Sequence, residues 1–190
     1  FGRELTEQYL KANECALQKY HALCREIDCD FQEQDAYVYS LNDREKIQQE
    51  CAALAALGVN AGFTESLPLP FPVAGAIQFR HQAQFHPLKF VSALSQTLHI
   101  YQHTPVRQLV GTTAVTDHGQ VAAKRIIVAT HFPFLNKHGG YFLKLYQHRS
   151  YVIALAHAQS AEGMYVDEAQ DGLSFRSHGE FLLLGGGAHR

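Results

Sequence analysis

The chain has 190 residues, of which 46% are hydrophobic and 18% are charged, so it can bury a sizeable core in one or two domains. Its net charge of -2 provides no electrostatic field for nucleic acid or acidic lipid. No apolar run approaches the roughly 18 residues that a membrane helix needs, and no signal peptide opens the chain, so the sequence predicts a cytoplasmic protein without membrane or nucleic-acid partners.

The first third of the chain predicts two helices with strands between them. Apolar residues recur at steps of three and four from Gly2 to about Arg25, as on one face of a helix. Short strands are expected over residues 27–31 and 35–41. Asp43 is placed to cap a second helix over residues 44–57, which Gly58 ends.

Cysteine and histidine spacing predicts no metal site. The four cysteines lack the paired close spacing of a zinc site, and free thiols buried as small apolar groups are expected instead; they are Cys15, Cys24, Cys29 and Cys51. The 12 histidines are scattered, without a pair that clearly shares a helical face.

Prolines mark the next section. Residues 63–73 contain three prolines and predict a connection that is neither a helix nor a central strand. Residues 73–84 predict a strand with a break at Gly75. Pro87 then begins a helix whose apolar face includes Leu88 and Val91.

Two short strands are expected over residues 104–110 and 112–116, followed by a turn at residues 117–119. The apolar run over residues 126–129, which Pro133 follows, predicts a third strand buried on both faces.

The last section predicts mostly antiparallel strands. After a short loop or helix over residues 135–143, strands are expected over residues 146–156 and 164–166, with a hairpin of residues 173–176 and 181–185. The fold class is therefore predicted as α+β, with an antiparallel or mixed sheet and helices on one side.

This order resembles the D-amino-acid-oxidase (DAO) family of FAD-dependent oxidoreductases, which includes the sarcosine and glycine oxidases. Thr104-Pro105-Val106 and Ile127-Val128-Ala129-Thr130 carry the likeness, and residues 171–187 look like the strand pair that passes over the flavin. The resemblance implies a DAO-type substrate domain in two parts, residues 1–84 and 136–190. It implies that residues 85–135 are a helix and β-meander piece of the FAD-binding domain.

The chain departs from the family in one respect. Family members begin with a strand, a G-x-G-x-x-G turn and a helix that hold the FAD pyrophosphate, and no such segment occurs here. We therefore expect an internal fragment of a longer enzyme. FAD is expected in the full-length protein, while the fragment alone is expected to lose FAD and activity.

By resemblance, the enzyme oxidises a C–N bond of an amine or amino acid by hydride transfer to flavin, and the protein supplies orientation and a cation for a substrate carboxylate. No residue is assigned as catalytic. The implied substrate-binding residues are Arg176, Arg149 and Tyr151, with Arg176 preferred because Gly185, Gly186 and Gly187 leave room above a ring system. The implied cofactor-binding residues are Val106, Ala129 and Thr130. Salt bridges and ordinary strand packing are the alternative roles.

A second functional class stays open at this point. The chain could instead be a noncatalytic small-molecule-binding or interaction domain that shares the fold, because fold does not fix function. Pairing of exposed apolar strands between chains predicts a dimer of the fragment. The residues give neither the substrate nor the electron acceptor.

Overall fold

The computed structural model describes residues 2–132, 134 and 140–189, and it divides the chain into two compact units. The first unit comprises Phe1–Leu94 and Arg149–His189, and the second comprises Ser95–His148. The expected borders at residues 84/85 and 135/136, and the assignment of each part to a substrate or FAD domain, stay predictions.

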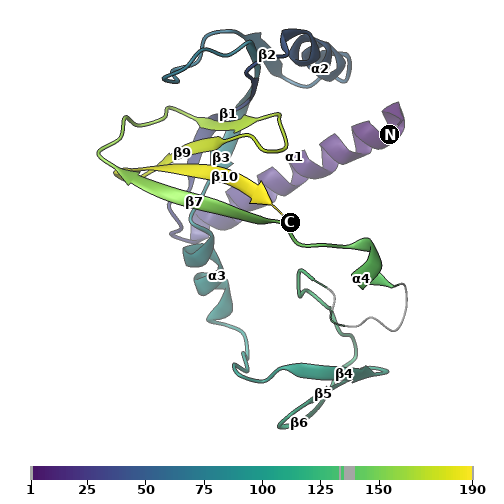
Figure 1. Cartoon of the computed structure of the whole chain (residues 1–190). Coiled ribbons are helices and arrows are strands. Elements are labelled where there is room, and N and C mark those ends of the chain that lie inside the picture. Colours follow the sequence, from purple (N-terminus) through teal and green to yellow (C-terminus); the bar gives the residue numbers. More distant parts are fainter. Residues whose placement is uncertain (1, 133, 135–139, 190) are drawn as a thin grey trace. The chain divides into compact units, whose positions relative to one another are not determined.

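A seven-stranded sheet organises the first unit (Figure 1). Its order is β2-β3-β1-β8-β9-β10-β7; the β1–β8 pair is parallel and the other pairs are antiparallel. The mixed α+β class is thereby confirmed. The helices and strands are α1 (Arg3–Glu26), β1 (Gln32–Ser40), α2 (Arg44–Ala56), β2 (Ala61–Thr64), β3 (Gly75–Gln84), α3 (Pro87–Ser95), β7 (Arg149–Ala156), β8 (Met164–Asp167), β9 (Ser174–His178) and β10 (Phe181–His189).

The two faces of this sheet are covered by different segments. On the α2 face, defined here by Ile77, the buried residues Ile47 and Leu54 of α2 pack against β2 and β3. On the loop face, defined by Tyr39, Tyr165 and Ala76, the proline-rich connection contributes Leu67, Leu69, Phe71 and Val73. Because side chains alternate along a strand, each strand residue can be assigned to one of these faces.

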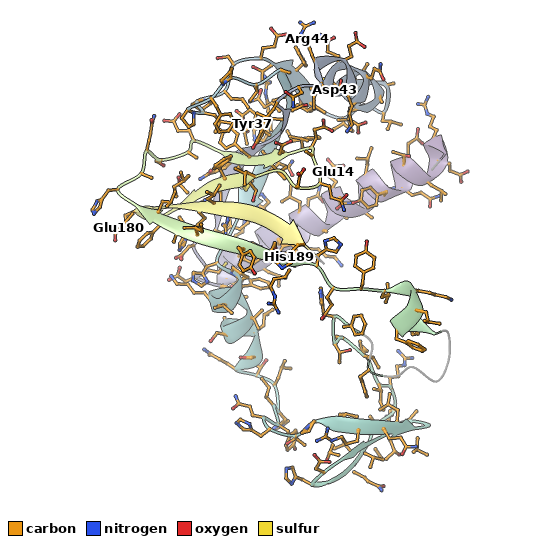
Figure 2. All side chains as sticks on the ribbon, viewed as in Figure 1. Glu14, Tyr37, Asp43, Arg44, Glu180 and His189 are labelled. Atoms are coloured by element: carbon orange, nitrogen blue, oxygen red, sulfur yellow. The ribbon has the colours of Figure 1, made fainter. Side chains whose placement is uncertain are left out.

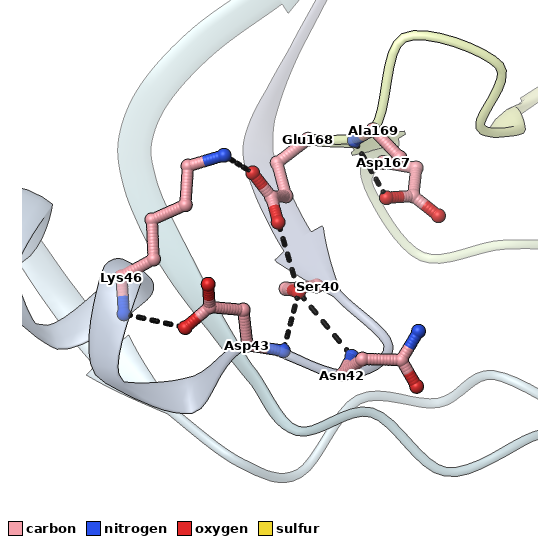
Figure 3. A network of polar contacts seen from close by, with 7 residues as sticks. All are labelled: Ser40, Asn42, Asp43, Lys46, Asp167, Glu168 and Ala169. Carbon is pink, nitrogen blue, oxygen red and sulfur yellow. Dashed lines mark hydrogen bonds and ion pairs between the residues drawn. The ribbon is translucent and has the colours of Figure 1, made fainter.

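A polar network fixes the start of α2 against β8 (Figure 3). The Asp43 carboxylate accepts a hydrogen bond from the Lys46 backbone N–H at 2.9 Å, which confirms the expected cap. Ser40 Oγ accepts from the backbone N–H of Asn42 and Asp43 and donates to Glu168, which also binds the Lys46 ammonium. The left-handed Gly58 follows α2, as expected (φ +76°).

The expected strand over residues 27–31 is wrong. These residues form a bent connection after α1, in which Asp30 has a left-handed backbone (φ +54°) that a regular strand cannot accommodate. The expected helix is confirmed as α1, although none of its residues is fully buried. Its last turns contact α3 through Tyr20, whose ring stacks on Phe85 and lies near Phe90.

The second unit contains a three-stranded antiparallel sheet of β4 (Val106–Val110), β5 (Thr113–Thr116) and β6 (Gly119–Ala122), and the short helix α4 (Tyr141–Lys144). The expected strand over residues 126–129 is wrong. The third strand of this sheet is β6, which lies earlier in the chain and ends at Ala122. Thr116 pairs with Gly119, so Asp117 and His118 form a two-residue hairpin turn, and β6 begins directly after it. Ile127 is 89% exposed. Pro133 and residues 135–139 of the expected connection lie outside the described residues.

Within the described part of the chain, no helix is both long enough and apolar enough to cross a membrane.

Candidate functional site

Arg176 lies on β9, between Met164 of β8 and Leu183 of β10. Its residue is half-buried, and its side chain belongs to the α2 face by strand alternation. One guanidinium N–H donates to Gln84 Oε1 at 3.2 Å. Among the described residues Arg176 takes part in no ion pair, which distinguishes it from Arg3, Arg44 and Arg107. A half-buried guanidinium that contacts only a neutral amide retains its charge for another anion.

Arg149 and Tyr151 lie on β7, at the edge of the sheet. Both alternate onto the loop face, so the structure does not bring them together with Arg176 on one face. Tyr151 stacks on the ring of His189 at a centroid distance of 5.6 Å. His189 lies near the end of β10 (Figure 2). Arg149 is opposite His189 in the ladder and is exposed.

Two of the three glycines after Leu184 are packed tightly within the sheet. A Cβ atom at Gly185 would lie 2.5 Å from Ser174 Oγ, and one at Gly186 would lie 2.5 Å from Leu173 Cδ2. The space beside these two glycines is therefore filled by neighbouring side chains, and it does not leave the expected room above a ring.

A shallow hollow of about 380 Å³ lies at the proline-rich connection and is lined mainly by residues 65–73. Arg44 lies over the ring of Phe63 and binds Glu65 at the start of this segment. No predicted substrate-binding or cofactor-binding residue lines the hollow.

Buried tyrosines form the centre of the loop face. Burial raises the pKa of Tyr39 to about 12, with a smaller effect of Asp167, and Tyr39 donates to the Leu173 carbonyl at 3.0 Å. Burial, followed by the neighbouring Tyr37, likewise raises the pKa of Tyr165 to about 12. The rings of Tyr37 and Tyr165 stack at 4.9 Å. With such pKa values Tyr39 and Tyr165 stay protonated at neutral pH, and we assign them to the core.

The three predicted cofactor-binding residues all lie in the second unit. Val106 begins β4 and pairs with Thr116. Ala129 and Thr130 follow β6 in an irregular segment, where Thr130 Oγ1 donates to the Phe132 carbonyl at 2.9 Å. Ala129 and Thr130 are exposed and Val106 is 36% exposed, so a ligand can reach them.

FAD fits these residues in part. Small side chains at Ala129 and Thr130 allow a dinucleotide to approach the backbone. A pyrophosphate also needs a glycine-rich turn before a helix, and no such turn precedes a helix in the described ranges. The N-terminus of α2 is already capped by the Asp43 carboxylate, which would repel a phosphate. The described part of the second unit can therefore contact FAD but supplies no phosphate cradle.

Among the described residues, no group of three or more His, Cys, Asp and Glu side chains is placed to hold a metal ion. The four cysteines are free thiols. Burial, followed by a hydrogen bond with Cys29, raises the pKa of Cys24 to about 11, so this thiol is not an activated nucleophile.

Gln84 is the site residue that the sequence did not identify. It ends β3 and is only 5% exposed, and among the described residues its amide is the one side chain that accepts a hydrogen bond from the Arg176 guanidinium. Its neighbours Gln78 and Gln82 lie on the same strand, so the sequence contained no signal that separated it from them.

The family model described as DAO, FAD dependent oxidoreductase, matches residues 2–190. A Bacillus subtilis protein, YhfW, whose name describes it as a Rieske 2Fe-2S iron-sulfur protein, is 32% identical over 201 residues. That match includes 97% of this chain and 40% of the relative, so this chain spans less than half of the relative's length.

Solved structures of oxidases and a dehydrogenase share the fold at low sequence identity. Glycine oxidase from Bacillus cereus has a TM-score of 0.72 at 15% identity, covering 100% of this chain and 57% of that one. L-proline dehydrogenase from P. horikoshii has a TM-score of 0.70 at 14% identity, covering 90% and 53%. Glycine oxidase from Geobacillus kaustophilus has a TM-score of 0.67 at 16% identity, covering 97% and 55%. With the family match over nearly all its length, the chain belongs to the DAO family of FAD dependent oxidoreductases.

Proposed function

We propose that this chain binds the substrate and part of the FAD of an oxidoreductase that oxidises a C–N bond of an amine or amino acid. The family match supports the oxidoreductase class. The printed names of two similar structures, glycine oxidase and L-proline dehydrogenase, support amino-acid substrates. Bound FAD supplies the acceptor for the hydride that leaves the carbon next to nitrogen.

The proposal rests on Arg176, a half-buried residue whose guanidinium donates to the neutral Gln84 amide and takes part in no ion pair among the described residues. A guanidinium binds a carboxylate through two parallel N–H donors. In Arg176, the Nη1 group is already held by its hydrogen bond to Gln84 Oε1. Its part would be to bind and orient the substrate carboxylate, so that the amine-bearing carbon has a fixed position. Val106, Ala129 and Thr130 would contact the dinucleotide through their backbone.

Flavin bleaching in the full-length protein tests this function. The purified protein should be yellow, and anaerobic addition of its amino-acid substrate should bleach the flavin. Arg176→Met should raise the substrate Kd about tenfold or more, since a hydrogen bond to a charged group contributes about 1.5–3 kcal/mol. Arg80→Met, at an exposed arginine of β3, should leave the Kd unchanged.

Other outcomes would redirect the proposal. A colourless protein that binds an amine would favour the noncatalytic binding domain. Weakened binding in Arg149→Met, with no change in Arg176→Met, would move the substrate carboxylate to the loop face beside Tyr151.

We also propose an iron–sulfur cluster as the electron acceptor, because the Bacillus subtilis relative is named for one. The described residues contain no ligand group for a metal, so the cluster would be held elsewhere. Anaerobic reduction of the full-length protein by substrate should then produce the electron paramagnetic resonance signal of a reduced [2Fe–2S] centre. Bleached flavin without that signal would leave oxygen or a quinone as the acceptor.

A further inference from the structure

Gln84 is buried at the end of β3, and its amide connects three strands. Its Nε2 group donates to Gln32 Oε1 of β1 at 2.9 Å and to the Ser177 carbonyl of β9 at 3.0 Å. Its Oε1 accepts from Arg176 at 3.2 Å. All of these contacts lie within the first unit.

This arrangement permits one orientation of the amide. If the Gln84 amide were rotated by half a turn, its NH₂ group would face the Arg176 N–H, and its oxygen would face two other oxygens. Both amide hydrogens are used, so Oε1 is held towards the guanidinium. The side chain is 5% exposed, which limits competition from water for these bonds.

The choice of an amide also determines the charge at this position. A carboxylate at residue 84 would neutralise Arg176 and would compete with an incoming anion. A neutral oxygen orients the guanidinium and leaves its charge available. An apolar side chain would leave the Arg176 rotamer unrestrained and would remove the Gln84 donor from the Ser177 carbonyl and from Gln32 Oε1, which would keep only its bond from Gln34 Nε2.

We propose that Gln84 is a positioning residue that holds Arg176 ready for a substrate carboxylate. The inference rests on the proposed function, since it takes Arg176 as the carboxylate-binding group. It concerns a buried amide that acts through the guanidinium and does not contact the substrate. Substitution of Gln84 should therefore weaken binding of the ligand's carboxylate and leave binding of its amine group unchanged.

Binding of trifluoroacetate to the full-length protein tests this without turnover, because this probe is a carboxylate that stays ionised over a wide pH range. Titration calorimetry should give a Kd that Gln84→Met raises about three- to tenfold and Arg176→Met raises further. Gln82→Met is the matched control, because the Gln82 amide donates to the nearby Arg80 carbonyl, and its Kd should equal that of the wild type.

A second variant separates positioning from a general loss of structure. In Gln84→Glu the introduced carboxylate should abolish probe binding at neutral pH, and binding should return as the pH falls and that carboxyl is protonated. A merely structural role for Gln84 would not restore binding in acid. If Gln84→Met does not fold, as judged by its urea midpoint, this pH series decides the question.

The failures of the two proposals look different. Wild-type affinity in Gln84→Met, together with weakened binding in Arg176→Met, would overturn the role of Gln84 and retain that of Arg176. Wild-type affinity in both variants would overturn the carboxylate role of Arg176 itself. The substrate Kd measured by flavin bleaching should then also be unchanged in both variants.

Discussion

Asp30 joins three segments of the first unit although it lies in a short connection. Its carboxylate accepts from the Lys89 ammonium of α3 at 2.7 Å, and its other oxygen is 3.9 Å from His178 Nε2 at the end of β9. The ring of His86 packs edge-on against His178. The Lys89 hydrogen bond lowers the pKa of Asp30, with smaller effects of the Lys89, His178 and His86 charges, while partial burial opposes the shift.

This shift predicts the pH dependence of an Asp30→Asn variant. A carboxyl whose pKa is lower in the folded state stabilises the fold above its unfolded pKa of about 3.9, and this contribution is lost as the pH falls through the folded value. Asparagine tolerates the left-handed backbone of residue 30, so charge is the main change. The variant should have a lower urea midpoint than the wild type at pH 7, and this difference should narrow as the pH falls below about 4 and vanish once the Asp30 carboxyl is protonated in the folded state.

Tyrosine fluorescence can follow this unfolding, since the chain has nine tyrosines and no tryptophan. Asp171→Asn, at an exposed aspartate, is the control and should show no such pH-dependent gap. A gap that does not narrow as the pH falls below about 4 would contradict the assigned pair of Asp30 and Lys89.

Single residues of the site were predictable to different degrees. Arg176 could be selected from the sequence because a carboxylate needs a cation and few arginines follow a strand pattern near the end of the chain. Its partner Gln84 is 92 residues away along the chain, and only the ladder of β3, β1, β8 and β9 brings the two together. No local pattern encodes a contact of that kind.

Helices and hairpins were predicted correctly from local sequence where capping or turn residues mark their ends. The α2 helix has a capping Asp43 and a terminating Gly58, and both act as expected. The β9–β10 hairpin likewise turns at residues 178–181, where Gly179 is left-handed. In such elements the residues that set the geometry are adjacent in sequence.

For the apolar run over residues 126–129, the local sequence predicted a strand that the structure does not contain. Hydrophobicity indicates burial, but a strand also needs a neighbour for its backbone groups, and that neighbour cannot be read from the run itself. In the structure this segment has no ladder partner among the described residues, and Ile127 and Val128 are exposed. The likeness to DAO-family strands therefore did not fix the local structure of this segment.

For the whole molecule, the core is distributed unevenly between the two units. Every buried residue among those described belongs to the first unit, and the three-stranded sheet of the second unit has none. Three short strands without a buried face are only marginally stable in water. The described part of the second unit thus has few contacts of its own to protect its backbone hydrogen bonds.

Hydrogen exchange should reveal this difference directly. Amides of β4, β5 and β6 should exchange well before those of β1, β3 and β8, because the latter strands border the buried residues Tyr39, Ile77 and Tyr165. If Val106, Ala129 and Thr130 contact FAD as proposed, adding FAD to the cofactor-free full-length protein should slow exchange over residues 106–130 and leave β2 unchanged. Slowed exchange at β2 alone would place the cofactor against the first unit and would remove these three residues from its binding site.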